Sequence, residues 1–172
     1  FSHRTSDGIR PRIMILTGDT SGVAGGVRAD NVTISNNEFL NFIGGSSGDG
    51  YAIRAIGGTG DNWTITGNSI YYNHALPLTG GIDALSFNPG VTAGNGSLIA
   101  NNFIGGSAPN AGGGHWIFDA ATGFSAIHVS AGTGTGVTVQ NNIVKNITTT
   151  GTASAFFNGI YSAYGTLNIQ GN

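Results

Sequence analysis

Cysteine is absent from the 172-residue chain, and lysine occurs once, at Lys145. Without cysteine the protein can form neither disulfides nor thiolate metal sites. Charged residues make up only 8% of the chain, the formal net charge is −2, and no basic run occurs. Because nucleic-acid-binding proteins need clustered Lys and Arg to neutralise phosphates, we expect no nucleic-acid partner.

Long apolar runs are also missing. No window approaches the roughly 18 consecutive apolar residues of a membrane-spanning helix, so we expect no membrane span. The opening "FSHRTSDGIRPR" has neither an initiator Met nor the apolar centre of a signal peptide. We interpret residues 1–172 as a single domain that is a fragment of a longer chain. The scarcity of lysine beside abundant Thr, Ser, Asn and Gly favours an extracellular or cell-surface location.

Glycine is abundant, at 31 positions, and this abundance argues against a helical fold because each glycine costs roughly 1 kcal/mol in a helix interior. A short motif organises the chain instead. It begins as "NVTISNNEF" at Asn31 and recurs as "NWTITGNSI", "GSLIANNFI", "GVTVQNNIV" and a shortened "TLNIQGN". The copies align on one apolar anchor each: Ile34, Ile65, Ile99, Val139 and Ile169.

The motif predicts a strand, a tight bend and a second strand. Three residues after each anchor stands an asparagine: Asn37, Asn68, Asn102, Asn142 and Asn172. The residue before it is Asn or Gly, the two types that best tolerate left-handed backbone angles: Asn36, Gly67, Asn101, Asn141 and Gly171. Apolar residues return at Phe39, Ile70, Ile104 and Val144. If the copies stack, each asparagine amide can donate to one neighbour and accept from the other, forming an internal ladder.

A weaker column lies upstream of each motif, in "YAIRAI", "GGIDAL", "SAIHVS" and "NGIYSA", with "RIMILTG" beginning the series. We align these segments on Ile53, Ile82, Ile127 and Ile160. Each repeat then supplies three short strands, and such strands cannot bury an apolar face alone. The repeats must therefore stack.

This pattern resembles the parallel β-helix repeat of polysaccharide lyases and large bacterial secreted and cell-surface proteins. The resemblance covers residues 13–172. It implies an all-β, right-handed, single-stranded parallel β-helix, a solenoid of about five rungs. The hand is implied by the family and agrees with the usual hand of parallel crossovers. Because this fold carries lyases, hydrolases, phage tailspikes and adhesins, it leaves the function open.

One outward column carries the chemically richest residues. If the upstream anchors point inward, the next residues point to solvent, and they are Arg54, Asp83, His128 and Tyr161. Arg54 could hold a carboxylate, Asp83 and His128 could exchange protons, and Tyr161 could stack or donate. The same column can also be an ordinary solvated face, since Asp83 has no acidic neighbour in it for a glycosidase pair.

Two insertions, starting at Tyr71 and Gly105, are expected to wall this column. They would bring to its edge His74, His115, Trp116, Asp119 and Phe124. Among these, we interpret Trp116 as a sugar-stacking surface. The histidines lack ligand partners at metal spacing, so we expect no metal site and no cofactor.

These observations leave two main function hypotheses. The first is a structural or adhesive segment of a large secreted or cell-surface bacterial protein, binding a polysaccharide or cell-surface glycan. Its open ends would contact flanking β-helix rungs or other chains. The alternative is a polysaccharide-active enzyme, a lyase or glycoside hydrolase, with Asp83 as the proton-transfer group, His128 as its partner, Arg54 as a carboxylate clamp and Trp116 as a platform. A phage tailspike segment is a weaker alternative.

Overall fold

The described part of the chain is built of β-strands alone. The structure is a computed structural model, and it describes residues 11–17, 28–43, 49–57, 59–74, 80–118, 123–150 and 156–172. In these residues no helix is present, which agrees with the all-β expectation. Accordingly, none of the described residues belongs to a helix long and apolar enough to cross a membrane.

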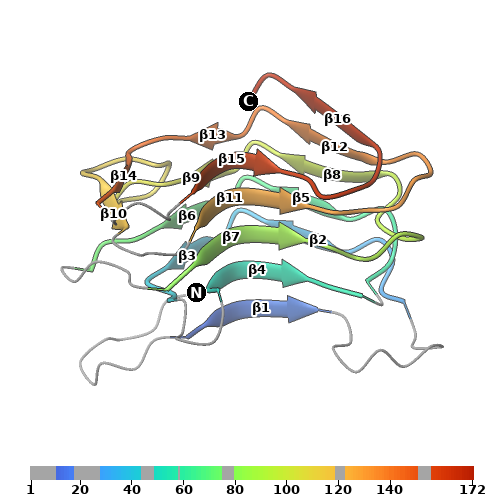
Figure 1. Cartoon of the computed structure of the whole chain (residues 1–172), viewed down its shortest axis with the longest axis horizontal. Coiled ribbons are helices and arrows are strands. Elements are labelled where there is room, and N and C mark those ends of the chain that lie inside the picture. The colour runs from blue at the N-terminus through green and yellow to red at the C-terminus, as the bar shows by residue number, and fades with distance from the viewer. Residues whose placement is uncertain are drawn as a thin grey trace.

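The strands form three larger sheets and one two-stranded sheet, all with parallel pairing (Figure 1). Sheet I contains, in spatial order, β1 (Ile13–Thr17), β4 (Tyr51–Ala55), β7 (Ile82–Phe87), β11 (Phe124–Val129) and β15 (Phe157–Tyr161). Sheet II contains β2 (Thr33–Ser35), β5 (Thr64–Thr66), β8 (Ser97–Ala100), β12 (Val137–Gln140) and β16 (Leu167–Gln170). Sheet III contains β3 (Glu38–Leu40), β6 (Ser69–Tyr71), β9 (Phe103–Ile104) and β13 (Ile143–Val144). The small sheet pairs β10 (Trp116–Phe118) with β14 (Ile147–Thr149).

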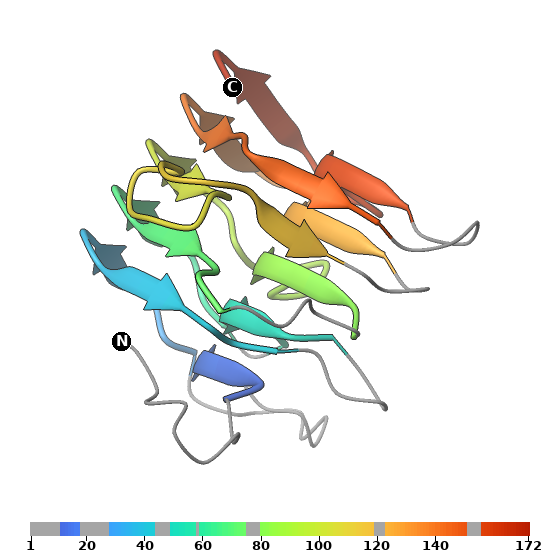
Figure 2. The same cartoon turned by 90° about the vertical axis from the view of Figure 1, so that its left-hand side faces the viewer.

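The chain visits the three sheets in a fixed order. From β2 onward a strand of sheet II is followed by one of sheet III and then by one of sheet I, with β10 and β14 inserted after β9 and β13. Strands that neighbour one another in a sheet are therefore one repeat apart in the sequence. Figure 1 shows this for sheet I, in which β1, β4, β7, β11 and β15 follow one another from bottom to top. Figure 2 shows the same succession from the side.

The register of sheets II and III confirms the alignment of the recurring motif. In sheet II the paired residues are Ile34, Ile65, Ile99, Val139 and Ile169. In sheet III they are Phe39, Ile70, Ile104 and Val144. Most of these side chains belong to the buried apolar core. The apolar positions of the motif thus face the interior from two sheets.

The bend between sheets II and III is left-handed at one residue in every copy. The φ angles are 55° at Asn36, 66° at Gly67, 55° at Asn101, 53° at Asn141 and 66° at Gly171. Only glycine and, with a small penalty, asparagine adopt such angles readily. The alternation of Asn and Gly at this position follows from that backbone requirement.

The asparagines after the bend form one continuous series of hydrogen bonds. Each Nδ2 donates to the Oδ1 of the next asparagine, at 3.1 Å from Asn37 to Asn68, 3.0 Å to Asn102, 3.0 Å to Asn142 and 2.8 Å to Asn172. The backbone N–H of each donor residue reaches the same Oδ1. Asn68 and Asn102 are 0% exposed. Their second Nδ2 hydrogen bonds go to Ile34 O and Ile65 O, so these buried amides are fully paired.

The expected alignment of sheet I is wrong at one strand. Ile53 and Ile127 pair with Leu85, not with Ile82, which lies opposite Phe124. Ile82 and Leu85 are both buried, so either residue suits an interior position, and the local sequence pattern alone favoured the wrong one. Asp83 and Ser86, three positions apart in β7, therefore pair with Ser125 and His128 of β11.

Trp116 lies in the core, so the expectation that it forms an exposed stacking surface is wrong. Its side chain is 0% exposed and contacts Phe42 and Phe124 edge-on and Tyr72 face to face, with ring centroids 5.7, 5.1 and 6.0 Å away. The reason is strand alternation, because Ile117 between Trp116 and the buried Phe118 is the residue that points outward. Phe124 is buried as well, and Asp119 lies outside the described residues.

Candidate functional site

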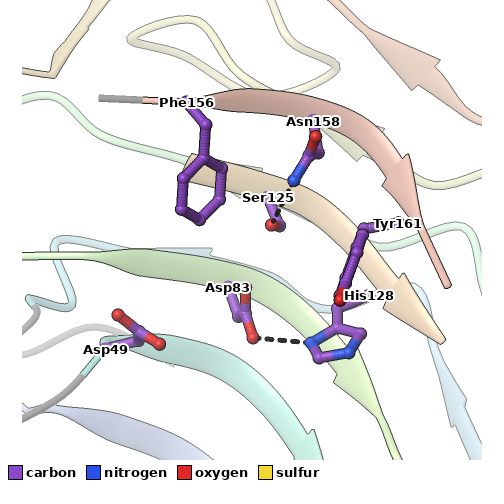
Figure 3. A pocket seen from close by; sticks show the side chains of 7 residues that line it. All are labelled: Asp49, Asp83, Ser125, His128, Phe156, Asn158 and Tyr161. Carbon is purple, nitrogen blue, oxygen red and sulfur yellow. Dashed lines mark hydrogen bonds and ion pairs between the residues drawn. The ribbon is translucent and has the colours of Figure 1, made fainter. Parts of the chain in front are cut away.

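A pocket of about 360 Å³ opens on the outward face of sheet I (Figure 3). Its wall is formed by polar and aromatic side chains that come from β7, β11, β15 and the residues just before β4 and β15. The lining residues are Asp49, Asp83, Ser125, His128, Phe156, Asn158 and Tyr161. Three of the four residues of the expected outward column therefore line one cavity, namely Asp83, His128 and Tyr161.

The register of the strands arranges these side chains in two rows. Ser125 pairs with Asp83 on one side and with Asn158 on the other. His128 pairs with Ser86 and with Tyr161. Asp83 and His128 thus belong to different rows and meet diagonally, because β7 is shifted by three residues relative to the expected alignment.

The central contact of the pocket joins Asp83 to His128. Oδ2 of Asp83 lies 2.9 Å from Nδ1 of His128, and the two side chains are 16% and 19% exposed. Since an ionised carboxylate can only accept, Nδ1 carries the hydrogen. The contact is a hydrogen bond when the ring is neutral and an ion pair when it is protonated.

Ser130 contacts the other nitrogen of the same ring. Its Oγ lies 3.3 Å from Nε2 of His128 and accepts the backbone N–H of Ala163 at 3.4 Å. The order carboxylate, imidazole, hydroxyl is that of a hydrolytic triad. However, Ser130 is 0% exposed, and a substrate carbonyl cannot reach a buried oxygen. We therefore interpret Ser130 as a residue that orients the imidazole ring.

Asp49 brings a second carboxyl group to the pocket. Burial raises the pKa of Asp49, and the charge of Asp83 raises it further, while Arg12, Arg54 and His128 act in the opposite direction. Arg12 is held beside it by a 3.0 Å hydrogen bond from Nε to the backbone oxygen of Asp49. The net upward direction means that positive charge around this carboxylate is insufficient to offset its burial.

Two exposed aromatic rings border the pocket. Phe156 is 55% exposed and Tyr161 is 42% exposed. The ring of Tyr161 lies 4.8 Å from that of His128, at an interplanar angle of 58°. Phe156 packs so closely over Gly123 that a Cβ there would overlap its ring. In Figure 3 this ring extends from the β15 end of the pocket toward Asp83 and Asp49. Both rings offer apolar faces beside polar groups.

Arg54 lies outside the pocket wall. It pairs with Leu16 and Ser86 in sheet I, and its guanidinium carbon is 4.5 Å from the centroid of the Tyr51 ring. Burial raises the pKa of the Tyr51 hydroxyl, an effect that the charge of Arg54 opposes. Arg54 thus makes a cation–π contact beside the site, and the expected carboxylate clamp is absent from the lining.

The histidines of the two insertions also lie apart from the pocket wall. The His74 ring packs near Tyr72, and Nδ1 of His115 contacts the hydroxyl of Thr148. Within the described ranges, no group of three or more His, Asp or Glu side chains could hold a metal ion. The pocket therefore offers carboxylates, an imidazole, an amide, a hydroxyl and two aromatic faces as its chemistry.

Sequence reasoning missed four of the lining residues: Asp49, Ser125, Phe156 and Asn158. The misaligned strand concealed the row that contains two of them. A usable signal was present in the spacing, because Ile53 and Ile127 each precede the next anchor by 12 residues. Leu85 precedes Ile99 by 14 residues and Ile82 precedes it by 17, so the spacing favours Leu85. Phe156 and Asp49 flank strands and carry no comparable signal.

Comparisons of the chain with protein-family models, with curated proteins and with solved structures find no match.

Proposed function

We propose that this chain is a stiff, glycan-binding segment of a large secreted or cell-surface protein, and that its strands wind as a right-handed single-stranded parallel β-helix. The function is adhesive and structural, and the pocket on sheet I is the glycan site.

Three features support the coil. The chain passes through sheets II, III and I in the same order in each repeat. All strand pairs are parallel, so each return to a sheet requires a crossover rather than a hairpin. The buried amides of Asn68 and Asn102 bond to copies of themselves one repeat away, which is possible only when successive repeats superimpose. A crystal structure would test both the coil and its hand.

The observation that carries the ligand proposal is the placement of Phe156 and Tyr161 around hydrogen-bonding groups. Sugar rings present apolar C–H faces and polar hydroxyl edges, so they fit a site with aromatic faces beside carboxylates and amides. Asp83, Ser125 and Asn158 supply acceptors and donors from three adjacent strands. The strands fix the positions of these groups, which keeps the entropy cost of binding low.

Binding to an array of neutral, acidic and amino-sugar oligosaccharides tests this function. We expect selective binding that falls at least about tenfold in Tyr161→Ala and in Phe156→Ala, since each variant removes one stacking face and tenfold is about 1.4 kcal/mol. Tyr164→Ala is the matched control, because Tyr164 is an exposed aromatic residue that does not line the pocket. Absence of binding to every glycan, or equal losses in all three variants, would contradict the proposal.

A specific observation also favours a second candidate, a polysaccharide-active enzyme. The pocket combines Asp83, ordered by His128, with Asp49, whose pKa is raised by burial and by Asp83. Glycoside hydrolases use two carboxyl groups, one of them protonated, around a scissile bond. In this case Asp49 would donate the proton and Asp83 would act as base or nucleophile.

Turnover separates the two candidates. Polysaccharides of the array would be incubated with the protein while reducing ends and unsaturated products are measured. Turnover that is lost in Asp49→Asn and in Asp83→Asn would establish the enzyme. Binding without turnover would establish the adhesive function.

A further inference from the structure

The pocket on sheet I contains two carboxyl groups, and their negative charge limits the class of glycan that it can bind. We infer that it recognises glycans with free amino sugars, through a primary ammonium group placed between the Asp49 and Asp83 carboxylates and beside the Tyr161 and Phe156 rings. This inference rests on the glycan-binding function proposed above and specifies its ligand.

Apart from the His128 imidazole, which is bonded to Asp83, the charged groups of the lining are carboxylates. Asp49 and Asp83 contribute two carboxylates, and neither arginine near the site lines it. Arg54 lies over Tyr51, and Arg12 bonds to the backbone oxygen of Asp49. A uronic acid would place its carboxylate against two like charges, whereas an ammonium group would form charge-assisted hydrogen bonds with them.

Without a ligand, the charged form of the Asp49 carboxyl group is disfavoured, and a bound cation would stabilise it. Asp49 is partly buried, and its charged form is disfavoured first by that burial and then by the neighbouring Asp83. The Asp83 carboxylate already accepts one hydrogen bond, from His128, through Oδ2. A carboxylate has room for several more, so Oδ1 can accept from a ligand without breaking this contact.

The aromatic residues reinforce the same preference. Phe156 and Tyr161 stand at the pocket wall with about half of their surfaces exposed. An aromatic face attracts a cation and also packs against the C–H face of a sugar. A ligand with both features, an ammonium on a pyranose ring, uses the carboxylates and the rings together.

Calorimetric titration with matched oligosaccharides tests the inference. The probes are a glucosamine hexamer, its fully N-acetylated counterpart, an oligogalacturonate of equal length and a lysine peptide of equal charge, at a pH at which the amino groups are protonated. We expect the glucosamine hexamer to bind at least about tenfold more tightly than the N-acetylated one, which corresponds to about 1.4 kcal/mol. Raising the salt concentration should reduce this preference.

Charge-matched variants assign the preference to the pocket. Asp49→Asn should reduce affinity for the glucosamine hexamer about tenfold and affinity for the N-acetylated hexamer much less. Asp83→Asn should reduce affinity for the glucosamine hexamer at least as much, and it should also weaken binding of the N-acetylated hexamer to a smaller extent, because Asp83 hydrogen-bonds any bound glycan and accepts from His128. Glu38→Gln removes one negative charge at an exposed residue of β3, where the new amide oxygen can still accept the 3.0 Å hydrogen bond from Tyr71, and it should change neither affinity. Circular dichroism of each variant checks that the fold is retained, and Asp49→Asn changes no hydrogen bond of the ladder.

The outcomes distinguish this inference from the function on which it rests. Equal or stronger binding of the N-acetylated hexamer, or preference for the oligogalacturonate, overturns the inference and leaves the glycan-binding function standing. If the lysine peptide binds as tightly as the glucosamine hexamer, the pocket recognises the cation without the sugar, and the inference that its ligand is an amino sugar is overturned. Failure of these oligosaccharides and of every glycan in the array to bind overturns both proposals.

Discussion

The asparagine ladder and the outward face of sheet I are built in opposite ways. In the ladder the same residue occupies the same position in five successive repeats, and the central amides are buried. On the outward face, the residues paired with His128 are Ser86 and Tyr161, and those paired with Ser125 are Asp83 and Asn158. One region repeats a residue, and the other changes it from strand to strand.

The difference follows from what adjacent side chains can do for one another. An asparagine carries both a donor and an acceptor, so identical copies satisfy each other at the interstrand spacing. Carboxylates cannot do so, because like charges directly opposite are destabilising. A chemical site on adjacent parallel strands therefore needs unlike neighbours, such as Asp83 beside His128. In this protein, positions with the same residue in every repeat stabilise the fold, and positions at which the residue changes from strand to strand form the candidate site.

The largest expected effect tests a residue that belongs to neither region. Trp116 comes from an insertion rather than from the repeat, yet it is completely buried among aromatic rings. Replacement by alanine should reduce the free energy of unfolding by about 4 kcal/mol, because it leaves a large cavity. Urea denaturation followed by circular dichroism measures the loss. Ile117→Ala, at the outward neighbour that is 48% exposed, should cost under about 1 kcal/mol. Similar losses in both variants would contradict this packing.

A substitution within the ladder should have the next largest effect. Asn102→Ala removes the acceptor of two N–H groups of Asn68 and the donor to Ile65 O and Asn142 Oδ1. Since a buried unpaired polar group costs about 1 to 3 kcal/mol, we expect a loss near 3 kcal/mol in the same denaturation experiment. Thr64→Ser, on the outward face of sheet II, should change stability by less than about 0.5 kcal/mol. A loss at Asn102 as small as that at Thr64 would show that the ladder is not stabilising.

Substitutions at the bend beside the ladder should reduce the free energy of unfolding less than substitutions within the ladder. Asn101 has a φ of 55°, so Asn101→Ala should cost about 1 kcal/mol through backbone strain, whereas Asn101→Gly should be neutral or stabilising. Thermal melts of the two variants provide the comparison. The reverse order would mean that the asparagine side chain, rather than its backbone angle, is what this position requires.

The smallest effect is expected at the outward face, where Asp49 should make stability depend on pH. The pKa of Asp49 in the folded protein is raised above its ordinary value of 3.8, so the unfolded chain loses this proton at lower pH than the folded one. Stability from this group is therefore present below 3.8 and is lost as pH rises through the raised folded pKa. Denaturation at a series of pH values should show wild type losing stability relative to Asp49→Asn over this window. A parallel course of the two curves would contradict the burial of Asp49.

The sequence predicted sheets II and III closely and sheet I less well. Anchors such as Ile65 and Ile99 pair as aligned, because each is followed at a fixed distance by a bend residue that locks the register. The upstream column has no such marker, and "GGIDALSF" offers two apolar residues that suit the interior, Ile82 and Leu85. Which of the two residues takes the anchor position depends on how β7 packs, and the local sequence pattern does not encode that packing.

The candidate site was predicted only in part, because its residues depend on the alignment of sheet I and on segments next to the strands. Asp83, His128 and Tyr161 were identified as outward residues and do line one pocket, although Asp83 reaches it from another row. Arg54 lies beside the pocket, and Trp116 is inside the core. Asp49 and Phe156 lie next to strands rather than within them, so alternation along a strand could not place them.

By itself, the sequence determined the bends, the ladder and the parallel register around them. Left-handed backbone angles require Asn or Gly, and amides that repeat at one position can pair with their own copies, so residue identity at a fixed spacing is sufficient there. Only the tertiary structure decided which unlike side chains meet. The contact of Asp83 with His128, the approach of Asp49 and the burial of Trp116 depend on strand offset and on segments that return from outside the repeat. Such contacts arise from long-range packing, which no local pattern specifies.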